Sequence, residues 1–118
     1  DGLRLRPDVD ISLTCCAAVW PVEVAAPVAL FVNEAVSNAL KHAFRTRGGR
    51  VEVTVAAASD DGLYRVGVAD DGEGFSDETR EGLGSHLMRG FARQLKGRLS
   101  RSARPFGPGA ELVIFFRP

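Results

Sequence analysis

The sequence predicts an α+β fold in which one mixed or antiparallel sheet carries helices on one face, a two-layer α/β sandwich. Short segments of alternating apolar residues indicate strands, and two longer segments show helical periodicity. The strands and helices follow one another without the regular alternation that is typical of parallel α/β proteins. Because 118 residues suit one modest core, we expect a single domain spanning residues 1–118.

The first half of the chain predicts a strand followed by a long helix. Apolar and polar residues alternate over 9–17, and a helical pattern then runs over 27–44. Pro27 is expected in the first turn of this helix, where a missing N–H costs nothing. The apolar face of the helix is expected to contain Val32, Ala35, Val36, Ala39, Leu40 and Ala43.

The second half predicts four strands and one more helix. Asp61-Gly62 is typical of a tight hairpin turn between two strands. Gly97 is expected to end the second helix, because glycine commonly follows a helix C-terminus. The expected elements are strands at 51–55, 64–68, 99–103 and 110–116, and a helix that starts after 82–84 and carries Leu87, Met88, Phe91, Ala92 and Leu95 on its apolar side.

Bulk composition argues against several functional classes. Fifteen basic and fifteen acidic residues cancel, so the net charge gives no reason to expect nucleic acid or an anionic membrane as a partner. No apolar run approaches the roughly 20 residues that cross a bilayer, and no signal peptide is visible. We therefore expect a cytoplasmic domain without direct membrane contact, cut from a longer protein that is itself either free or membrane-anchored. The adjacent Cys15 and Cys16 suit neither a disulfide framework nor a zinc site, and are expected to be small buried residues.

The long helix carries a polar arc opposite its apolar face. Glu34, Asn38 and His42 are each one turn apart and share this arc, with Lys41 beside them. A carboxylate and an amide oxygen at this spacing suit Mg²⁺, and the lysine can neutralise a phosphate. A solvated helix face would show the same pattern, and taken alone this is the commoner explanation.

Two glycine-containing segments add to this pattern. In Asp70-Asp71-Gly72-Glu73-Gly74 the glycines allow a ligand close to the backbone, and an Asp at the end of the preceding strand can accept a hydrogen bond from an amino group such as that of adenine. Gly82-Leu83-Gly84 opens a helix, whose free N–H groups suit phosphate. Each segment alone is equally consistent with an ordinary turn or a flexible loop. Their order along the chain, metal then base then phosphate, predicts a nucleotide pocket.

The whole chain resembles the ATP-binding domain of histidine kinases, which belong to the Bergerat-fold (GHKL) ATPase superfamily. The resemblance rests on the N box, the G1 box at 70–74 and the G2 box at 82–84; the N box reads Asn33-Glu34-x-x-x-Asn38-Ala39-x-Lys41-His42-Ala43. The amino-acid sequences of residues 38–44 and 92–99 are similar to those of kinases neighbouring the HWE type, although we find no Trp-x-Glu signature. Gly109-Ala110 stands where the subgroup usually has Gly-Thr, so the comparison with the subgroup implies a weaker hydrogen bond near the base.

The resemblance implies a role for each matching residue. Asn38 would hold Mg²⁺ against the ATP phosphates, Glu34 would orient a water or the incoming nucleophile, and Lys41 with His42 would meet phosphate. Asp70 would bind the adenine amino group. Arg80 would reach inward from a lid over 75–81, which we expect to be disordered without nucleotide. The residues expected to bind ATP are Asn38, Lys41, His42, Asp70, Gly72, Gly74, Arg80, Gly82, Leu83 and Gly84.

The resemblance also implies partners that lie outside this chain. A histidine kinase needs a dimerisation and phosphoacceptor domain, and it acts indirectly on a response regulator. No acceptor helix pair is visible here, so the isolated chain is expected to bind ATP without phosphorylating itself. His86 is expected to be an exposed helix residue. Two alternatives stay open: an anti-sigma-factor serine kinase with a similar pocket, and a degenerate module that only binds proteins.

Overall fold

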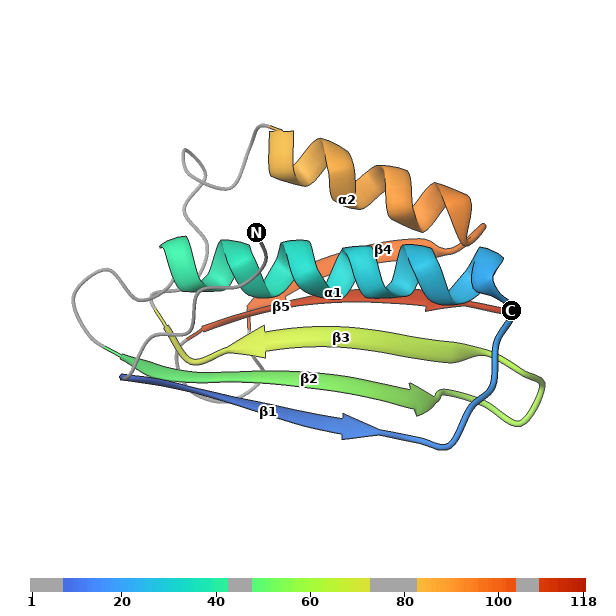
Figure 1. The fold of residues 1–118 in the computed structure, drawn as a ribbon, viewed down its shortest axis with the longest axis horizontal. Helices are drawn as coiled ribbons and strands as arrows, with labels where there is room; N and C mark the ends of the chain where they lie inside the picture. The colour runs from blue at the N-terminus through green and yellow to red at the C-terminus, as the bar shows by residue number, and fades with distance from the viewer. Residues whose placement is uncertain (1–7, 43–47, 73–82, 104–108) are drawn as a thin grey trace.

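The fold consists of a five-stranded sheet covered on one face by two helices (Figure 1). The computed structural model describes residues 8–42, 48–72, 83–103 and 109–118. The strand order is β1-β2-β3-β5-β4, with β1 and β2 parallel and the other neighbours antiparallel. The elements are β1 (Val9–Cys15), α1 (Val22–His42), β2 (Gly49–Ala57), β3 (Tyr64–Asp70), α2 (Leu83–Gln94), β4 (Arg98–Ala103) and β5 (Ala110–Phe116). The predicted α+β two-layer fold is confirmed.

The core lies between the sheet and the helices. Alternate residues of the three central strands point toward the helices, and Phe31 of α1 is completely buried against them. Burying a side chain of this size contributes about 2–3 kcal/mol. The strands contribute Val9, Val51, Val53, Val55, Val66, Val68, Leu112, Ile114 and Phe116, the helices contribute Val28, Phe31, Ala35, Val36, Ala39, Met88 and Ala92, and Leu95 follows α2.

An aromatic cluster closes the end of the core where α1 begins. Trp20, in the connection between β1 and α1, packs edge-on against Tyr64 and Phe116 at centroid distances of 5.3 and 5.4 Å. Tyr64 starts β3 and Phe116 ends β5, so the cluster ties the connection to the sheet. Edge-to-face pairs of this kind add about 0.5–1.5 kcal/mol each beyond their buried area.

The start of α1 differs from the prediction. The helix begins at Val22, so Pro27 lies inside it instead of in its first turn. The amides of Val24 and Ala25 each donate to the carbonyl of Pro21 at 2.9 Å, which makes Pro21 the proline at the helix start. Pro27 removes only the hydrogen bond to the carbonyl of Glu23, an exposed residue of the first turn, and this carbonyl can bond water instead.

The edge strand β1 also differs from expectation. Its register with β2 places Ile11 beside Val51 and Leu13 beside Val53, on the helix-covered face of the sheet. Leu13 is nevertheless 68% exposed, because β1 is the edge strand farthest from α2. The expectation of two buried cysteines is wrong for the same reason: Cys15 is a free, exposed thiol on this edge, and Cys16 is half-buried.

The end of α2 is built by two residues with separate tasks. Lys96, not Gly97, adopts the left-handed conformation (φ 53°). The N–H of Lys96 donates to the carbonyl of Arg93 and that of Gly97 to the carbonyl of Ala92, at 3.0 and 2.9 Å, which is the Schellman pattern. Gly97 is needed for a different reason, since a Cβ there would clash with the carbonyl oxygen of Phe115 in β5.

The hairpin between β2 and β3 matches the Asp61-Gly62 signal. Gly62 has a φ of 92°. Hydrogen bonds from the Ser59 hydroxyl and the Arg117 guanidinium hold the pKa of Asp61 below its usual range. Within the described part of the chain, neither helix is long and apolar enough to cross a membrane.

Candidate nucleotide site

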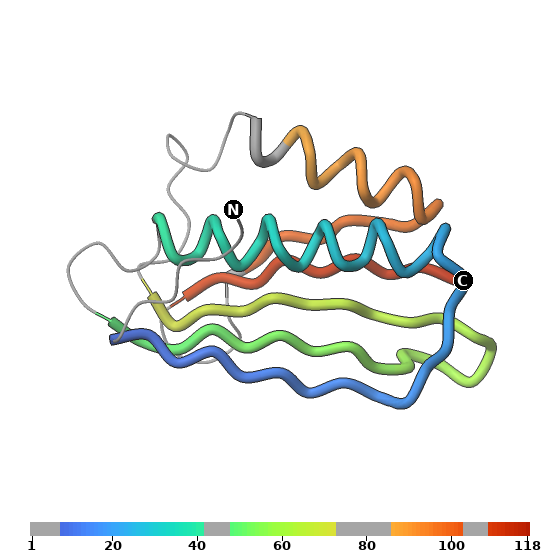
Figure 2. The backbone as a smooth tube through the Cα atoms, viewed as in Figure 1, coloured from blue at the N-terminus to red at the C-terminus, as the bar shows by residue number. Residues whose placement is uncertain are grey.

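The elements that carry the predicted site meet at one end of the molecule. The C-terminal ends of α1 and β3 lie on the left in Figure 1, and α2 begins at its own left end. The backbone tube shows the same course for α1 and β3 (Figure 2). This convergence follows from the topology, because α1 and β3 both run toward this end and α2 starts from it. The fold therefore brings the N box, Asp70 and the start of the G2-box helix to a common region.

The polar arc of α1 lies at the boundary between core and solvent. Glu34 and Asn38, one turn apart, are both half-buried, whereas Asn33 and Lys41 are exposed. The buried Ala35 and Ala39 follow these two residues in sequence and lie on the core side. A purely solvated face would leave Glu34 and Asn38 as exposed as Asn33. His42 is the last residue of α1, and its side chain lies outside the described part.

Asp70 is a predicted site residue that the structure buries. It ends β3, pairs with Val51 and Ala110 on either side, and shares the helix-covered face with Val68. Only 5% of its surface is exposed, and among the described residues it is the one polar or charged residue that is buried. One carboxylate oxygen accepts a hydrogen bond from the N–H of Gly72 at 3.0 Å. A buried carboxylate held in one orientation is suited to recognise a hydrogen-bond donor.

The neighbouring Asp71 has a different task. Its carboxylate accepts from the N–H of Arg50 at 2.7 Å, and its own N–H donates to the Arg50 carbonyl at 3.2 Å. Asp71 thus extends the pairing of β2 and β3 by one residue beyond the strand end. The sequence singled out Asp70 through the family pattern, but spacing alone does not separate the two acids.

Several predicted site residues lie outside the described part of the chain. These are Gly74, Arg80, Gly82 and the whole predicted lid at 75–81, so its predicted disorder stays a prediction. Leu83 and Gly84 are the first two residues of α2, as expected for a glycine box that opens a helix. His86 is exposed on α2, as predicted.

Ala110 occupies the position where the sequence departs from the family pattern. It is directly opposite Asp70 in the β3–β5 register and is 2% exposed. The preceding Gly109 has a φ of 120°, which favours glycine. A hydroxyl at position 110 would therefore lie beside the Asp70 carboxylate.

Comparison with known proteins settles the family. Residues 23–118 match the family model of histidine kinase-, DNA gyrase B- and HSP90-like ATPases. The chain belongs to this ATPase family. The match includes α1, β3 and α2, and the ATPase family implies that the domain binds a nucleotide.

Relatives place this ATPase domain among the histidine kinases. It is 39% identical over 85 residues to blue-light-activated histidine kinase 2 of Erythrobacter litoralis, covering 68% of this chain and 24% of that protein. It is 30% identical over 131 positions to the sensor-type histidine kinase PrrB of Mycobacterium tuberculosis, covering 97% and 28%. The histidine kinase domain of the Erythrobacter litoralis EL346 blue-light activated kinase superposes with a TM-score of 0.82 at 29% identity, covering 95% of this chain and 52% of that one. The chain spans about a quarter of the length of the curated relatives.

Proposed function

We propose that residues 1–118 form a cytoplasmic ATPase domain that binds ATP with Mg²⁺ and supplies the γ-phosphoryl group to a histidine on another domain of a sensor kinase. The observation that carries this proposal is the buried Asp70 carboxylate, fixed by Gly72 beneath the helix layer. The partner is the dimerisation and phosphoacceptor domain, and a response regulator receives the phosphoryl group afterwards.

Asp70 is proposed to recognise the adenine amino group. A carboxylate can accept several hydrogen bonds, so the Asp70 carboxylate that accepts from the Gly72 N–H would also accept from the amino group. Burial makes this recognition selective, because a base without the donor would leave the carboxylate badly solvated. Gly72 is itself buried, so the base can lie close to the backbone at this turn.

The polar arc of α1 is proposed to serve the phosphates. Asn38 would offer its amide oxygen to Mg²⁺, with the phosphates and water completing the shell, since Mg²⁺ keeps several waters and seldom uses an all-protein cage. No group of three or more His, Cys, Asp or Glu in the described ranges is arranged to hold a metal, and the amide of Asn38 is a suitable hard-oxygen donor. Lys41, exposed one turn nearer the end of α1, would neutralise phosphate charge.

The chemistry requires positioning and charge neutralisation more than covalent work by the protein. A bound Mg²⁺, which Asn38 would hold, would supply positive charge against the phosphates. Glu34, one turn before Asn38 and half-buried, would orient the nucleophile that enters from the partner domain. The phosphates would also be bound by His42, Arg80 and the G2-box residues Gly82, Leu83 and Gly84. The adenine base would also be bound at Gly74.

Calorimetry of ATP binding with and without Mg²⁺ tests this proposal. The native chain is expected to bind ATP, and Mg²⁺ is expected to strengthen binding. In Asn38→Ala, the gain in ATP affinity on adding Mg²⁺ should be about tenfold smaller than in the native chain, because a ligand of the ion is lost. Asn33→Ala is the matched control, since Asn33 is an exposed amide on the same helix. Absence of ATP binding, or an unchanged Mg²⁺ effect in Asn38→Ala, would contradict the proposal.

A paired substitution at position 110 tests the missing hydroxyl. Ala110→Thr is expected to bind ATP about fivefold more tightly than Ala110→Val, the gain of roughly 1 kcal/mol that one hydrogen bond provides. Threonine and valine have nearly the same shape, so both variants disturb the buried position equally and the difference reports the hydroxyl beside Asp70. Equal affinities for the two variants would show that no such hydrogen bond forms.

A further inference from the structure

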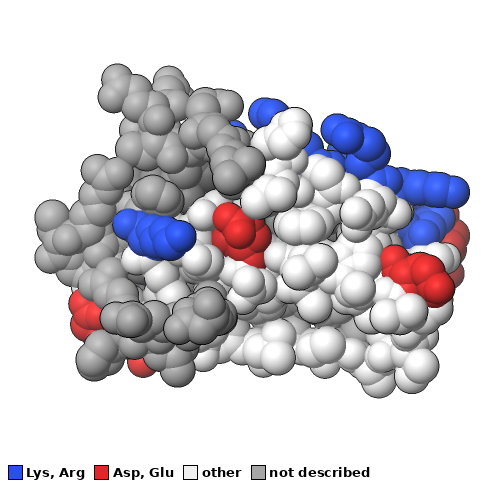
Figure 3. Space-filling model, turned by 45° about the horizontal axis from the view of Figure 1, so that its top comes forward, with Lys and Arg blue, Asp and Glu red and all other residues white. Residues whose placement is uncertain are grey.

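The zero net charge of this chain conceals an uneven distribution. The segment 83–103 contains Arg89, Arg93, Lys96, Arg98 and Arg101 and no acidic residue. On the helix side, Arg89, Arg93, Lys96 and Arg101 are all exposed, and we call this set the basic face. Figure 3 shows basic side chains gathered along the upper right edge of the molecule. Basic surface is thus concentrated over α2 and β4.

The acidic residue that follows this segment does not neutralise the basic face. Glu111 of β5 is opposite Ser102 of β4, on the face of the sheet away from the helices. There its carboxylate is bound by Arg65, at 3.1 Å. The positive potential of the basic face is therefore not cancelled by Glu111, and it suits an acidic partner.

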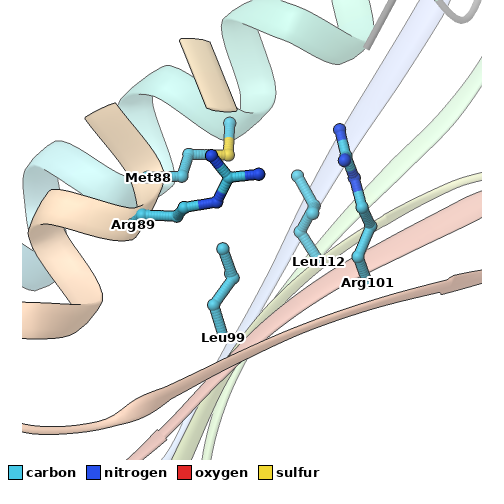
Figure 4. A pocket seen from close by; sticks show the side chains of 5 residues that line it. All are labelled: Met88, Arg89, Leu99, Arg101 and Leu112. Atoms are coloured by element: carbon cyan, nitrogen blue, oxygen red, sulfur yellow. The ribbon is translucent and has the colours of Figure 1, made fainter. Parts of the chain in front are cut away.

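A pocket opens within the basic face. It has a volume of about 200 Å³ and is lined by Met88 and Arg89 from α2, by Leu99 and Arg101 from β4, and by Leu112 from β5. Met88 and Leu112 are buried and Leu99 is half-buried, so the floor is apolar. In Figure 4 the two arginines extend from opposite sides of this space, one from the helix and one from the strand.

The pocket is distinct from the nucleotide site. Leu112 pairs with Val68, which lies two residues before Asp70 along β3, so the floor is set back from the end of the strand. In Figure 4, α1, the helix that carries Glu34 and Asn38, lies behind α2, whereas the pocket lies in front, over β4 and β5.

We propose that this face docks an acidic segment of a partner protein that inserts one bulky apolar side chain into the pocket. The volume suits a leucine or phenylalanine side chain. Arg89 and Arg101 would bind carboxylates on either side of this residue, with Arg93 on α2 and Lys96 just after it extending the charge. An apolar anchor in a pocket flanked by arginines is the arrangement in which few residues supply most of the binding energy.

A protein segment fits these observations better than a membrane surface. Membrane-binding helices combine basic residues with large apolar side chains that insert into lipid. Of the exposed large apolar residues in the described ranges, only Leu87 belongs to α2; Ile11, Leu13, Val19, Val22 and Leu30 lie on β1, α1 or the connection between them. The basic face offers a recess for an apolar group in place of a protruding one. The proposal does not depend on nucleotide binding.

Met88 provides a direct reporter, because it is the only methionine in the chain. A ¹³C-methyl methionine label therefore gives one NMR resonance from the pocket floor. The probe is a capped peptide of sequence Glu-Asp-Glu-Phe-Glu-Asp-Glu. Titration is expected to shift the methyl resonance saturably, and replacing the phenylalanine of the peptide with alanine should weaken binding at least about tenfold. Raising the salt concentration should weaken binding as well.

Charge variants distinguish specific peptide binding at the pocket from unspecific electrostatic attraction to the chain. Arg89→Gln and Arg101→Gln are each expected to weaken peptide binding about five- to tenfold. Arg50→Gln, at an exposed position of β2, makes the same charge change elsewhere and should leave the affinity within twofold. ¹⁵N spectra of each variant check that the fold is retained, and ATP titration of the same samples reports the nucleotide site separately.

Three outcomes would overturn the proposal. The first is a methyl resonance that does not move at millimolar peptide. The second is equal weakening by Arg50→Gln and Arg89→Gln, which would indicate unspecific attraction. The third is binding to vesicles of anionic phospholipid that depends on Arg89 and Arg101 while the peptide has no effect, which would identify a membrane surface.

Discussion

Asp70→Asn is expected to lower the affinity for ATP by about 100-fold or more and to leave the fold intact. The carboxylate is buried and held by the Gly72 N–H, so the replacement amide would take the same place. Its oxygen can keep the bond to Gly72, but its NH₂ group would then face the adenine amino group. Two donors would meet in a buried site, at a cost of about 3 kcal/mol when the lost charged hydrogen bond is included.

The adjacent acid gives a matched control for this measurement. Asp71→Asn makes the same chemical change one residue later, where the side chain accepts from the Arg50 amide at the end of the β2–β3 pair. ATP affinity measured by calorimetry should change less than threefold in this variant, and thermal unfolding should show both variants folded. If Asp71→Asn lost ATP binding and Asp70→Asn kept it, the assignment of the two carboxylates would be reversed.

The central strands were predictable because alternate apolar residues in each of them are buried. Val51, Val53 and Val55 are buried as their spacing predicts, and so are Val66 and Val68 on the antiparallel partner. The same alternation in β1 indicated a strand but not its exposure, which depends on its place at the sheet edge. Strand order is a long-range property that local periodicity does not contain.

The predicted details of the helix ends were wrong where two nearby residues suit the same position in a helix start or a helix end. Pro21 and Pro27 both suit a helix start, and the packing of Trp20 on Tyr64 fixes the earlier one. Lys96 and Gly97 raise the same difficulty at the end of α2. Glycine is the usual left-handed residue, but here it is required by the close approach of β5. Tertiary contacts decide both cases.

The candidate site followed from motif order, whereas the basic face did not. Glu34, Asn38 and Asp70 carry recognisable spacing, and the topology brings their elements to one end of the sheet. The basic face is formed by residues from α2 and β4 that meet only in the folded chain. The formal net charge of zero over 118 residues gave no indication of this face, because a net charge does not say where in the fold the charged residues lie.

Gly97→Ala is expected to lower the free energy of unfolding by about 2–3 kcal/mol. A Cβ at this position would clash with the carbonyl oxygen of Phe115 and lie at 3.0 and 3.1 Å from side-chain atoms of Phe116 and Ile114. The nearest atom belongs to the backbone of a paired strand, so it cannot turn aside as a flexible side chain would. Relief would require α2 to move away from β5, which would open the core around Leu95.

Gly90→Ala is the matched control because it adds the same methyl group at a glycine inside α2, whereas Gly97 follows the helix. A Cβ at Gly90 would meet no atom within 4 Å. Alanine should therefore stabilise the helix interior by about 0.5–1 kcal/mol through its higher helix propensity. Urea unfolding of the two variants should shift the midpoint in opposite directions. If Gly97→Ala were as stable as the native chain, the close packing of the α2 end on β5 would be wrong, and the position of α2 over the pocket would need revision with it.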